Sequence, residues 1–392
     1  MIYLDNHSTT RLDPRVLEAM LPWLTDHYGN AGSVTHEMGR EARAAVEQAR
    51  ETLALAIGAT AREIVFTIGA TESINLAILG AAARQERGRG HVVTVATEHH
   101  AVLDPVEHLE RTGVAVTRLP VGPQAGPGVA GRLRLDDLER AIRADTFLVS
   151  VMLANNEIGV VQDVAAIAAL VHARGGILHV DCAQAIGRMS VDVDSIGADL
   201  ASFSAHKFHG PKGAGALYVR RRERVVRIDP LVHGGGQERG MRSGTLDVPG
   251  IVGMAEATRL ATESLPVEAG RLRDLRDRLW RRLEAAVPGI ALNGPLLDDP
   301  ALRLVNNLNV CVPGVDGQSL LETVAGDGLA VSSGSACSSE SPRPSHVLLA
   351  LGLDEDQARA SLRFGVSRFT TAEEVDQAAA IIATGVGRLR SL

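Results

Sequence analysis

The sequence predicts an α/β fold in which a largely parallel sheet is covered by helices on both faces. The chain has 392 residues, of which 45% are hydrophobic, and short apolar runs alternate with helical stretches from residue 64 onward. Strands that alternate with helices are typical of parallel βαβ units. A chain of this length and composition forms two or three domains with a large buried core.

Two helices precede the first strand. A capping carboxylate followed by proline is a preferred helix start, so Asp13 and Pro14 begin a helix that runs to about residue 27. A second helix covers about 37–57, and Gly58 stands where a helix commonly ends. The strands expected next are 64–67, 91–96, 114–119, 146–152 and 177–180, with helices near 72–87, 103–112, 135–144 and 164–174.

The C-terminal part predicts a smaller α+β domain. A long charged helix over 252–287 leads into it. Its expected elements are a strand at 304–312, a helix at 318–325, a Gly/Ser-rich loop at 332–344, a strand at 362–366 and a helix from 371 to 389. We assign residues 13–258 to the large domain, and residues 1–12 and 259–392 to the small one.

Composition excludes several classes of protein. The net charge is -7 and only 3% of residues are aromatic, which argues against direct nucleic-acid binding. No apolar stretch is long enough to span a bilayer, and the first residues do not resemble a secretory signal. Three cysteines form no disulfide framework, so we expect a cytoplasmic protein without a membrane partner.

Lysine use is the first pointer to chemistry. Of 40 basic residues other than histidine, only Lys207 and Lys212 are lysines. A lysine amine, unlike a guanidinium, can lose its proton and form an imine. Pyridoxal 5'-phosphate supplies both an aldehyde for Lys207 and a phosphate that the nearby polar side chains of Ser204 and His206 could reach. The alternative is that both lysines are leftovers of a drift toward arginine.

Further polar clusters follow the predicted strands, where ligands of parallel sheets bind. Gly69–Glu72 could bind an anion at a helix start, although many strand-to-helix turns look similar. Asp181, with Gln184 three residues on, could keep a pyridine nitrogen protonated, or it could simply cap the next helix. Asn155–Gly159 could be a plain turn. His99 could stack on a cofactor or protonate it, or it could do neither.

Cys337 lies among small, mostly hydroxylated residues, in the sequence SSGSACSS. This pattern fits neither a packed core nor a metal site with CxxC spacing, and it suggests a nucleophile on a loop. Cys182 and Cys311 lie in apolar surroundings and are interpreted as packing residues.

Taken together, these motifs resemble the cysteine desulfurases of the IscS/NifS type, pyridoxal-phosphate enzymes of the class V aminotransferase family. The resemblance covers nearly the whole chain. The matching motifs are YLDN (3–6), GATES (69–73), EHxAVLD (98–104), NNEIGVVQD (155–163), DxxQ (181–184), SFSAHKFHGPKG (202–213), GGGQERGMRSGT (234–245), SSGSACSS (332–339) and SLRFGVSRFT (361–370).

The resemblance implies a PLP-dependent transferase of fold type I, with a mostly parallel seven-stranded sheet in the large domain. It implies that Lys207 binds the cofactor covalently and that His99 stacks on the ring as an acid/base. The other implied cofactor residues are Asp181 at the ring nitrogen, Gln184 at the ring hydroxyl, Asn156, and the phosphate ligands Ala70, Thr71, Ser204, His206 and, from the other subunit of a homodimer, Thr245. Asn156 and Arg363 would bind the substrate carboxylate.

The implied reaction converts L-cysteine to L-alanine and leaves the sulfur as a persulfide on Cys337. A sulfur-acceptor protein would then receive it, for iron–sulfur cluster assembly, tRNA thiolation or DNA phosphorothioation. No metal is implied. The chain departs from the family pattern at Ser8 and Arg11 of the opening motif, at Ala31, at Ile68 and Ile74 beside the phosphate turn, and at Val366 and Ser367.

Other functions remain to be weighed. A selenocysteine lyase or an ordinary aminotransferase would use the same scaffold, but a plain aminotransferase has no need of Cys337. A catalytically inactive scaffolding relative would be free to lose Lys207, Asp181 or His99. A dinucleotide-binding dehydrogenase is not supported. Such enzymes carry a GxGxxG motif after their first strand, and the glycine-rich segment 234–240 does not match it.

Overall fold

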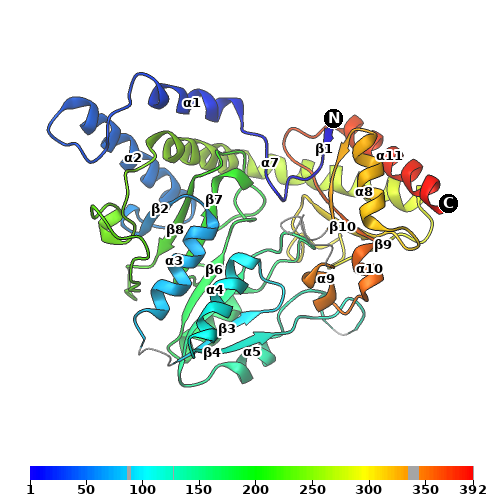
Figure 1. Ribbon diagram of the computed structural model, residues 1–392, viewed down its shortest axis with the longest axis horizontal. Helices are drawn as coiled ribbons and strands as arrows, with labels where there is room; N and C mark the ends of the chain where they lie inside the picture. The colour runs from blue at the N-terminus through cyan, green and yellow to red at the C-terminus, as the bar shows by residue number, and fades with distance from the viewer. Residues whose placement is uncertain (86–89, 127, 334–343, 392) are drawn as a thin grey trace.

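The computed structural model describes residues 1–85, 90–126, 128–333 and 344–391. Its centre is a seven-stranded sheet in the order β2-β8-β7-β6-β5-β3-β4 (Figure 1). Four of its neighbouring pairs are parallel, and β8 runs antiparallel to both β2 and β7. The mostly parallel sheet expected from the sequence is therefore confirmed. The strands are β2 (Ile64–Thr67), β3 (His91–Val95), β4 (Ala115–Leu119), β5 (Thr146–Met152), β6 (Ile177–Asp181), β7 (Leu200–Ser204) and β8 (Gly215–Val219).

Two of these strands, β7 and β8, are missing from the strands expected from apolar runs. All ten of their residues are buried. Strands covered on both faces show no alternation of polar and apolar residues. Two serines in β7 and the Gly-Ala start of β8 shorten the apolar runs, so neither strand was recognisable from its pattern.

Helices cover both faces of the sheet. On one face lie α1 (Pro14–Leu24), α2 (Glu37–Ala56), α5 (Leu135–Ala141), α6 (Val164–Ala173) and the first part of α7 (Val248–Ala286). On the other lie α3 (Ala70–Ala82) and α4 (His100–Arg111). Alternate residues of one strand enter the two cores: Phe66 packs with the first group and Val65 with the second.

A second group of elements surrounds a smaller antiparallel sheet in the order β12-β13-β10-β9. Its core also takes in the second part of α7, which crosses from one group to the other, and both chain ends lie in this group (Figure 1). The elements are β1 (Ile2–Tyr3), paired with β11 (Leu329–Ala330), then β9 (Ala291–Leu292), β10 (Asn307–Cys311), α8 (Gly317–Gly326), β12 (Ser332–Ser333), α9 (His346–Ala350), α10 (Glu355–Arg359), β13 (Ser361–Gly365) and α11 (Ala372–Arg390). The domain division at 258/259 falls inside α7 and stays a prediction.

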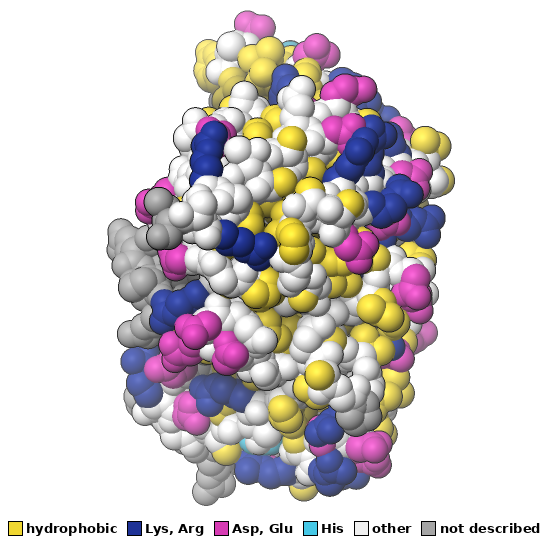
Figure 2. Space-filling model, turned by 90° about the vertical axis from the view of Figure 1, so that its right-hand side faces the viewer, with side chains coloured by type: hydrophobic (Ala, Val, Ile, Leu, Met, Phe, Trp, Pro, Cys, Tyr) yellow, Lys and Arg dark blue, Asp and Glu magenta, His cyan; other side chains and the backbone are white. Residues whose placement is uncertain are grey.

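The surface carries charges of both signs. On the face shown in Figure 2, acidic and basic side chains are interspersed with hydrophobic ones. Among the described helices, none has the length and apolarity that crossing a membrane would require.

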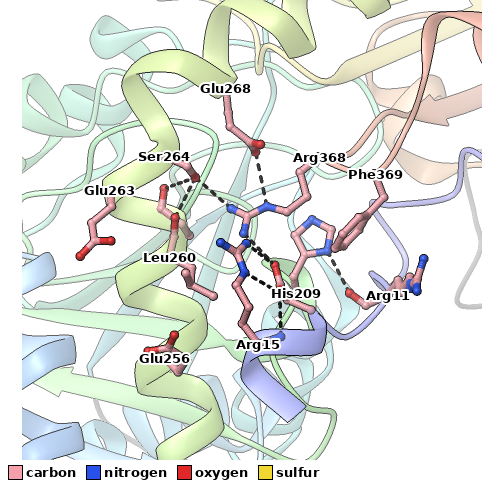
Figure 3. A network of polar contacts seen from close by, with 12 residues as sticks. Arg11, Arg15, His209, Glu256, Leu260, Glu263, Ser264, Glu268, Arg368 and Phe369 are labelled. Atoms are coloured by element: carbon pink, nitrogen blue, oxygen red, sulfur yellow. Dashed lines mark hydrogen bonds and ion pairs between the residues drawn. The ribbon is translucent and has the colours of Figure 1, made fainter. Parts of the chain in front are cut away.

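A buried polar network ties the N-terminal segment, α7 and the loop after β13 together (Figure 3). Asp13 caps α1 and accepts two hydrogen bonds from the Arg15 guanidinium and one, at 3.1 Å, from Arg368. Arg368 also donates to Ser264 and lies 3.4 Å from a carboxylate oxygen of Glu268, both on α7. These hydrogen bonds hold the pKa of Asp13 well below its ordinary value, because they favour the ionised carboxylate.

We predict that Asp13→Ala lowers the free energy of unfolding by about 3 kcal/mol, since it removes the N-cap of α1 and leaves the buried Arg368 guanidinium without this carboxylate. Urea unfolding at neutral pH measures this. Asp354→Ala is the matched control, because it removes only the cap of the short helix α10 and should cost about 1 kcal/mol. Equal losses in the two variants would contradict a stabilising role for the network.

Candidate active site

A cavity of about 790 Å³ lies where the carboxyl ends of the central strands meet. Its walls include Asp181 at the end of β6, Ser204 at the end of β7, Met152 at the end of β5 and the residues that follow β2 and β3. This is the edge at which open α/β sheets bind ligands. Side chains that are far apart in the sequence therefore face a single space.

Lys207 follows β7 in a single turn of 3-10 helix, Ala205–Lys207. Its ammonium group donates hydrogen bonds to the backbone carbonyls of His7, at 2.7 Å, and Ser8, at 2.8 Å. The N-terminal segment thus forms one wall of the cavity. Lys212 lines the same cavity from an exposed position, so both lysines of the chain lie there.

Asp181 and His99 both line the cavity, and the pKa of each side chain is shifted from its ordinary value. Burial raises the pKa of Asp181 to about 6, and the nearby Lys207 charge opposes this shift. Burial, assisted by Lys207, lowers the pKa of His99 to about 4, so its ring is neutral at pH 7. The Nδ1 atom of His99 accepts a hydrogen bond from the backbone N–H of Ala101, at 3.0 Å, which leaves the ring proton on Nε2.

The start of α3 faces the cavity from another side. Ala70 and Thr71 are its first residues and line the cavity together with Ser204 and His206. Free N–H groups at a helix start attract anions. Gly215 allows the turn before α3 to approach β8, since a Cβ there would lie 2.5 Å from the Cα of Gly69.

Arg363 reaches the cavity from β13 and is 2% exposed. It donates to Asp5 Oδ1 at 2.9 Å, to Ser8 Oγ at 2.8 Å and to the carbonyl of Asn156 at 3.2 Å. Its Nε atom is buried and has no hydrogen-bond partner among the described residues. An unsatisfied guanidinium donor at a cavity suits a carboxylate ligand.

Motif residues without an assigned role also line the cavity. The Glu98 carboxylate accepts from the backbone N–H of Met152 at 2.9 Å, and burial raises its pKa well above the ordinary value. The Glu157 carboxylate accepts from the Ser345 hydroxyl at 2.5 Å, and burial raises its pKa to about 7. Both glutamates lie inside motifs of the sequence, beside His99 and Asn156, and that adjacency was the available signal.

His7 is the least expected residue of the site. It is fully buried, lines the cavity, and contacts Gln184 through both its ring and its backbone carbonyl. It stands at a position that the family's opening motif leaves variable, so the sequence carried no signal for it.

Most of the predicted site residues therefore face one cavity: Ala70, Thr71, His99, Asn156, Asp181, Gln184, Ser204, His206, Lys207 and Arg363. Thr245 does not line it and is exposed in this single chain. Cys337 lies outside the described residues. Cys182 and Cys311 are buried. Among the described residues, no group of His, Cys, Asp and Glu is arranged to bind a metal ion.

Chemically, the cavity offers a primary amine, a carboxylate, a helix start with hydroxyl groups and a guanidinium. These groups could hold an aldehyde that carries a phosphate, together with a substrate that carries a carboxylate. Their roles in this chain remain predictions.

Comparisons with known proteins identify the family. Residues 2–378 match the family model of class-V aminotransferases. The cysteine desulfurase IscS of Methylobacillus flagellatus is 50% identical over 392 residues, which cover 100% of this chain and 93% of that protein. The IscS of Salmonella schwarzengrund is also 50% identical, over 393 residues that cover 100% of this chain and 94% of that protein.

Solved structures agree with these relatives. A NifS-like protein superimposes with a TM-score of 0.89 at 39% identity, covering 99% of this chain and 100% of that one. DndA from Streptomyces lividans gives a TM-score of 0.76 at 41% identity, covering 93% and 99%. The resemblance and the fold class predicted from the sequence are thus confirmed. The chain belongs to the class-V aminotransferase family, in its cysteine desulfurase branch.

Proposed function

We propose that the chain is a homodimeric, pyridoxal 5'-phosphate-dependent cysteine desulfurase that transfers the sulfur of L-cysteine to Cys337. The observation that carries this proposal is that Lys207, Asp181 and Arg363 face one cavity. Each group matches one need of the reaction: an amine for the cofactor, a carboxylate for its ring nitrogen, and a guanidinium for the substrate carboxylate.

The residues present fit this cofactor. The unsatisfied Nε of Arg363 supports an anionic ligand, and the start of α3 with Thr71, Ser204 and His206 suits a phosphate. Lys207 would bind the aldehyde carbon, and Asp181 would hold the ring nitrogen protonated. When bound, the cofactor withdraws electrons from the substrate Cα.

The side chains supply positioning and proton transfer. Arg363 and Asn156 orient the L-cysteine carboxylate. His99 would stack on the cofactor ring, and its proton, which lies on Nε2, would be donated as the C–S bond breaks. The Lys207 amine, once the substrate has displaced it, would be the base that removes the Cα proton.

Sulfur transfer then needs no external oxidant. The Cys337 thiolate attacks the substrate sulfur, an S–S bond forms, and the electron pair of the broken C–S bond stays on Cβ. Of the two protons taken from Cα and from the Cys337 thiol, one completes the methyl group at Cβ and the other returns to Cα, which gives L-alanine. The sulfur is oxidised to the persulfide level while Cβ is reduced, so L-cysteine and the thiol give L-alanine and the Cys337 persulfide.

A second subunit would complete the site. Ile68 lines the cavity, yet it is 61% exposed. Leu231 and Val232, which precede the segment that carries Thr245, are exposed as well. Exposed apolar side chains at a cavity mouth favour cover by another chain. In the homodimer, Thr245 would reach the phosphate bound by the other subunit.

The final acceptor is a protein that takes the persulfide sulfur. The relatives include IscS proteins and a DndA, so iron–sulfur cluster assembly, tRNA thiolation and DNA phosphorothioation all remain candidate pathways. We place this transfer in the cytoplasm, without direct contact to nucleic acid or membrane. L-selenocysteine is the second candidate substrate, because Arg363 would bind its carboxylate equally well.

We predict that incubation with L-cysteine, without reductant, adds about 32 Da (one sulfur atom) to Cys337 and releases L-alanine. Intact-mass and peptide-mass measurements, with an alanine assay, check this. Cys337→Ser should give neither product, while Cys311→Ser, which changes a buried cysteine of β10, should give both. Added sulfur that maps elsewhere would contradict the role of Cys337.

We predict that Thr245→Ala weakens binding of pyridoxal phosphate about tenfold, the loss expected for one hydrogen bond to a charged group. A mixed dimer of Thr245→Ala and Lys207→Ala subunits tests whether Thr245 acts across the interface. One of its two sites then keeps both residues and binds as tightly as wild type. If Thr245 acts within its own subunit, neither site does, and that result would reject the shared site.

A further inference from the structure

Four buried side chains form an unbroken hydrogen-bonded chain from the smaller sheet to the cavity, in the order Arg303, Asn307, His7 and Gln184. Their exposed fractions are 0%, 0%, 1% and 5%. We name this chain the Arg303–Gln184 relay. None of its first three members was expected to contribute to the site.

Arg303 fixes the direction of the first hydrogen bond. Its guanidinium donates to the Asn307 side-chain oxygen at 2.9 Å and to the carbonyls of Asn293, at 2.9 Å, and Pro295, at 2.6 Å. Within the described ranges, no carboxylate lies at ion-pair distance from this guanidinium. A guanidinium only donates, so the Asn307 oxygen must face it and the Asn307 amide nitrogen must face away.

The orientation of the Asn307 amide determines which ring nitrogen of His7 is an acceptor. Its amide nitrogen donates to the Glu157 carbonyl at 2.9 Å, which independently requires the same orientation. The second N–H of this nitrogen points to His7 Nε2, 3.2 Å away, which must therefore be the acceptor. Packing leaves Asn307 little freedom, since a Cβ on Gly159 would lie 2.6 Å from its Cγ.

Gln184 requires the same tautomer of His7 from the opposite end. The amide nitrogen of Gln184 donates to the His7 carbonyl at 3.0 Å, so its oxygen, 3.1 Å from His7 Nδ1, must accept from an N–H there. Burial and nearby Arg188 and Arg363 keep the pKa of His7 well below its ordinary value, which agrees with a neutral ring. The amide nitrogen of Gln184 then retains one N–H for a group in the cavity.

We propose that the Arg303–Gln184 relay is a positioning device, in which His7 locks the Gln184 amide with an N–H donor directed at the ring oxygen of the bound cofactor. This inference rests on the proposed function, because it needs pyridoxal phosphate in the cavity. The buried positive charge of Arg303 polarises each hydrogen bond of the relay in the same direction. The relay therefore favours negative charge on that ring oxygen.

His7→Phe tests the relay, because it removes both ring nitrogens and keeps the backbone carbonyl that holds Lys207. The matched control is His91→Phe, since His91 is also fully buried and both of its ring nitrogens bond to threonine hydroxyls, on β3 outside the cavity lining. The measurement is a pH titration of the visible absorption band that the cofactor forms with Lys207, which needs no turnover.

We predict that the titration midpoint of His7→Phe moves to higher pH by about one unit, the equivalent of one hydrogen bond. Without the N–H donor of Gln184, the ring oxygen is more basic. The proton that it shares with the Lys207 nitrogen is therefore held more tightly. His91→Phe should titrate as wild type. Asn307→Leu, which interrupts the relay one step earlier, should move the midpoint in the same direction and decides the matter if His7→Phe does not fold.

Three results would overturn the relay. If wild type forms the band and both His7→Phe and Asn307→Leu have the wild-type midpoint, Gln184 needs no orientation by His7. The proposed function then stands. If His91→Phe moves the midpoint as far as His7→Phe, the shift reflects general loss of packing. A wild-type protein that forms no band with pyridoxal phosphate would remove the relay and the proposed function together.

Discussion

The site depends on the hydrogen bonds by which two consecutive carbonyl groups, those of His7 and Ser8, hold the Lys207 ammonium. They bring the N-terminal segment to the carboxyl edge of the central sheet. The same segment binds Arg363 of β13 through Asp5 and Ser8. The cavity thus exists only where the N-terminal segment, the large sheet and the smaller antiparallel sheet meet.

Burial gives this junction its chemistry. It raises the pKa of Asp181 to about 6 and lowers that of His99 to about 4, so neither group carries its full charge readily. Glu98 Oε2 and Arg363 Nε are buried at the cavity without hydrogen-bond partners among the described residues. Such groups are costly unless a ligand satisfies them, which favours a charged cofactor and substrate at this place.

Much of this arrangement could be predicted from the sequence, because polar residues after apolar runs mark the carboxyl edge of a parallel sheet. Asp181 and His99 follow that rule, and the strands β2 and β5 have the predicted bounds. The strands β7 and β8 were not predicted because two serines and a Gly-Ala start shorten their apolar runs. His7 and Asn307 escaped because their partners lie 177 and 300 residues away in the chain, and no local pattern records such contacts.

The central claim is that Lys207 is the residue that binds the cofactor, and the scarcity of lysine makes it directly testable. The protein would be loaded with pyridoxal phosphate, reduced with borohydride, digested and mapped by mass spectrometry. We predict a pyridoxyl group on Lys207 and an unmodified Lys212. A pyridoxyl group on Lys212, or on neither lysine, would contradict it.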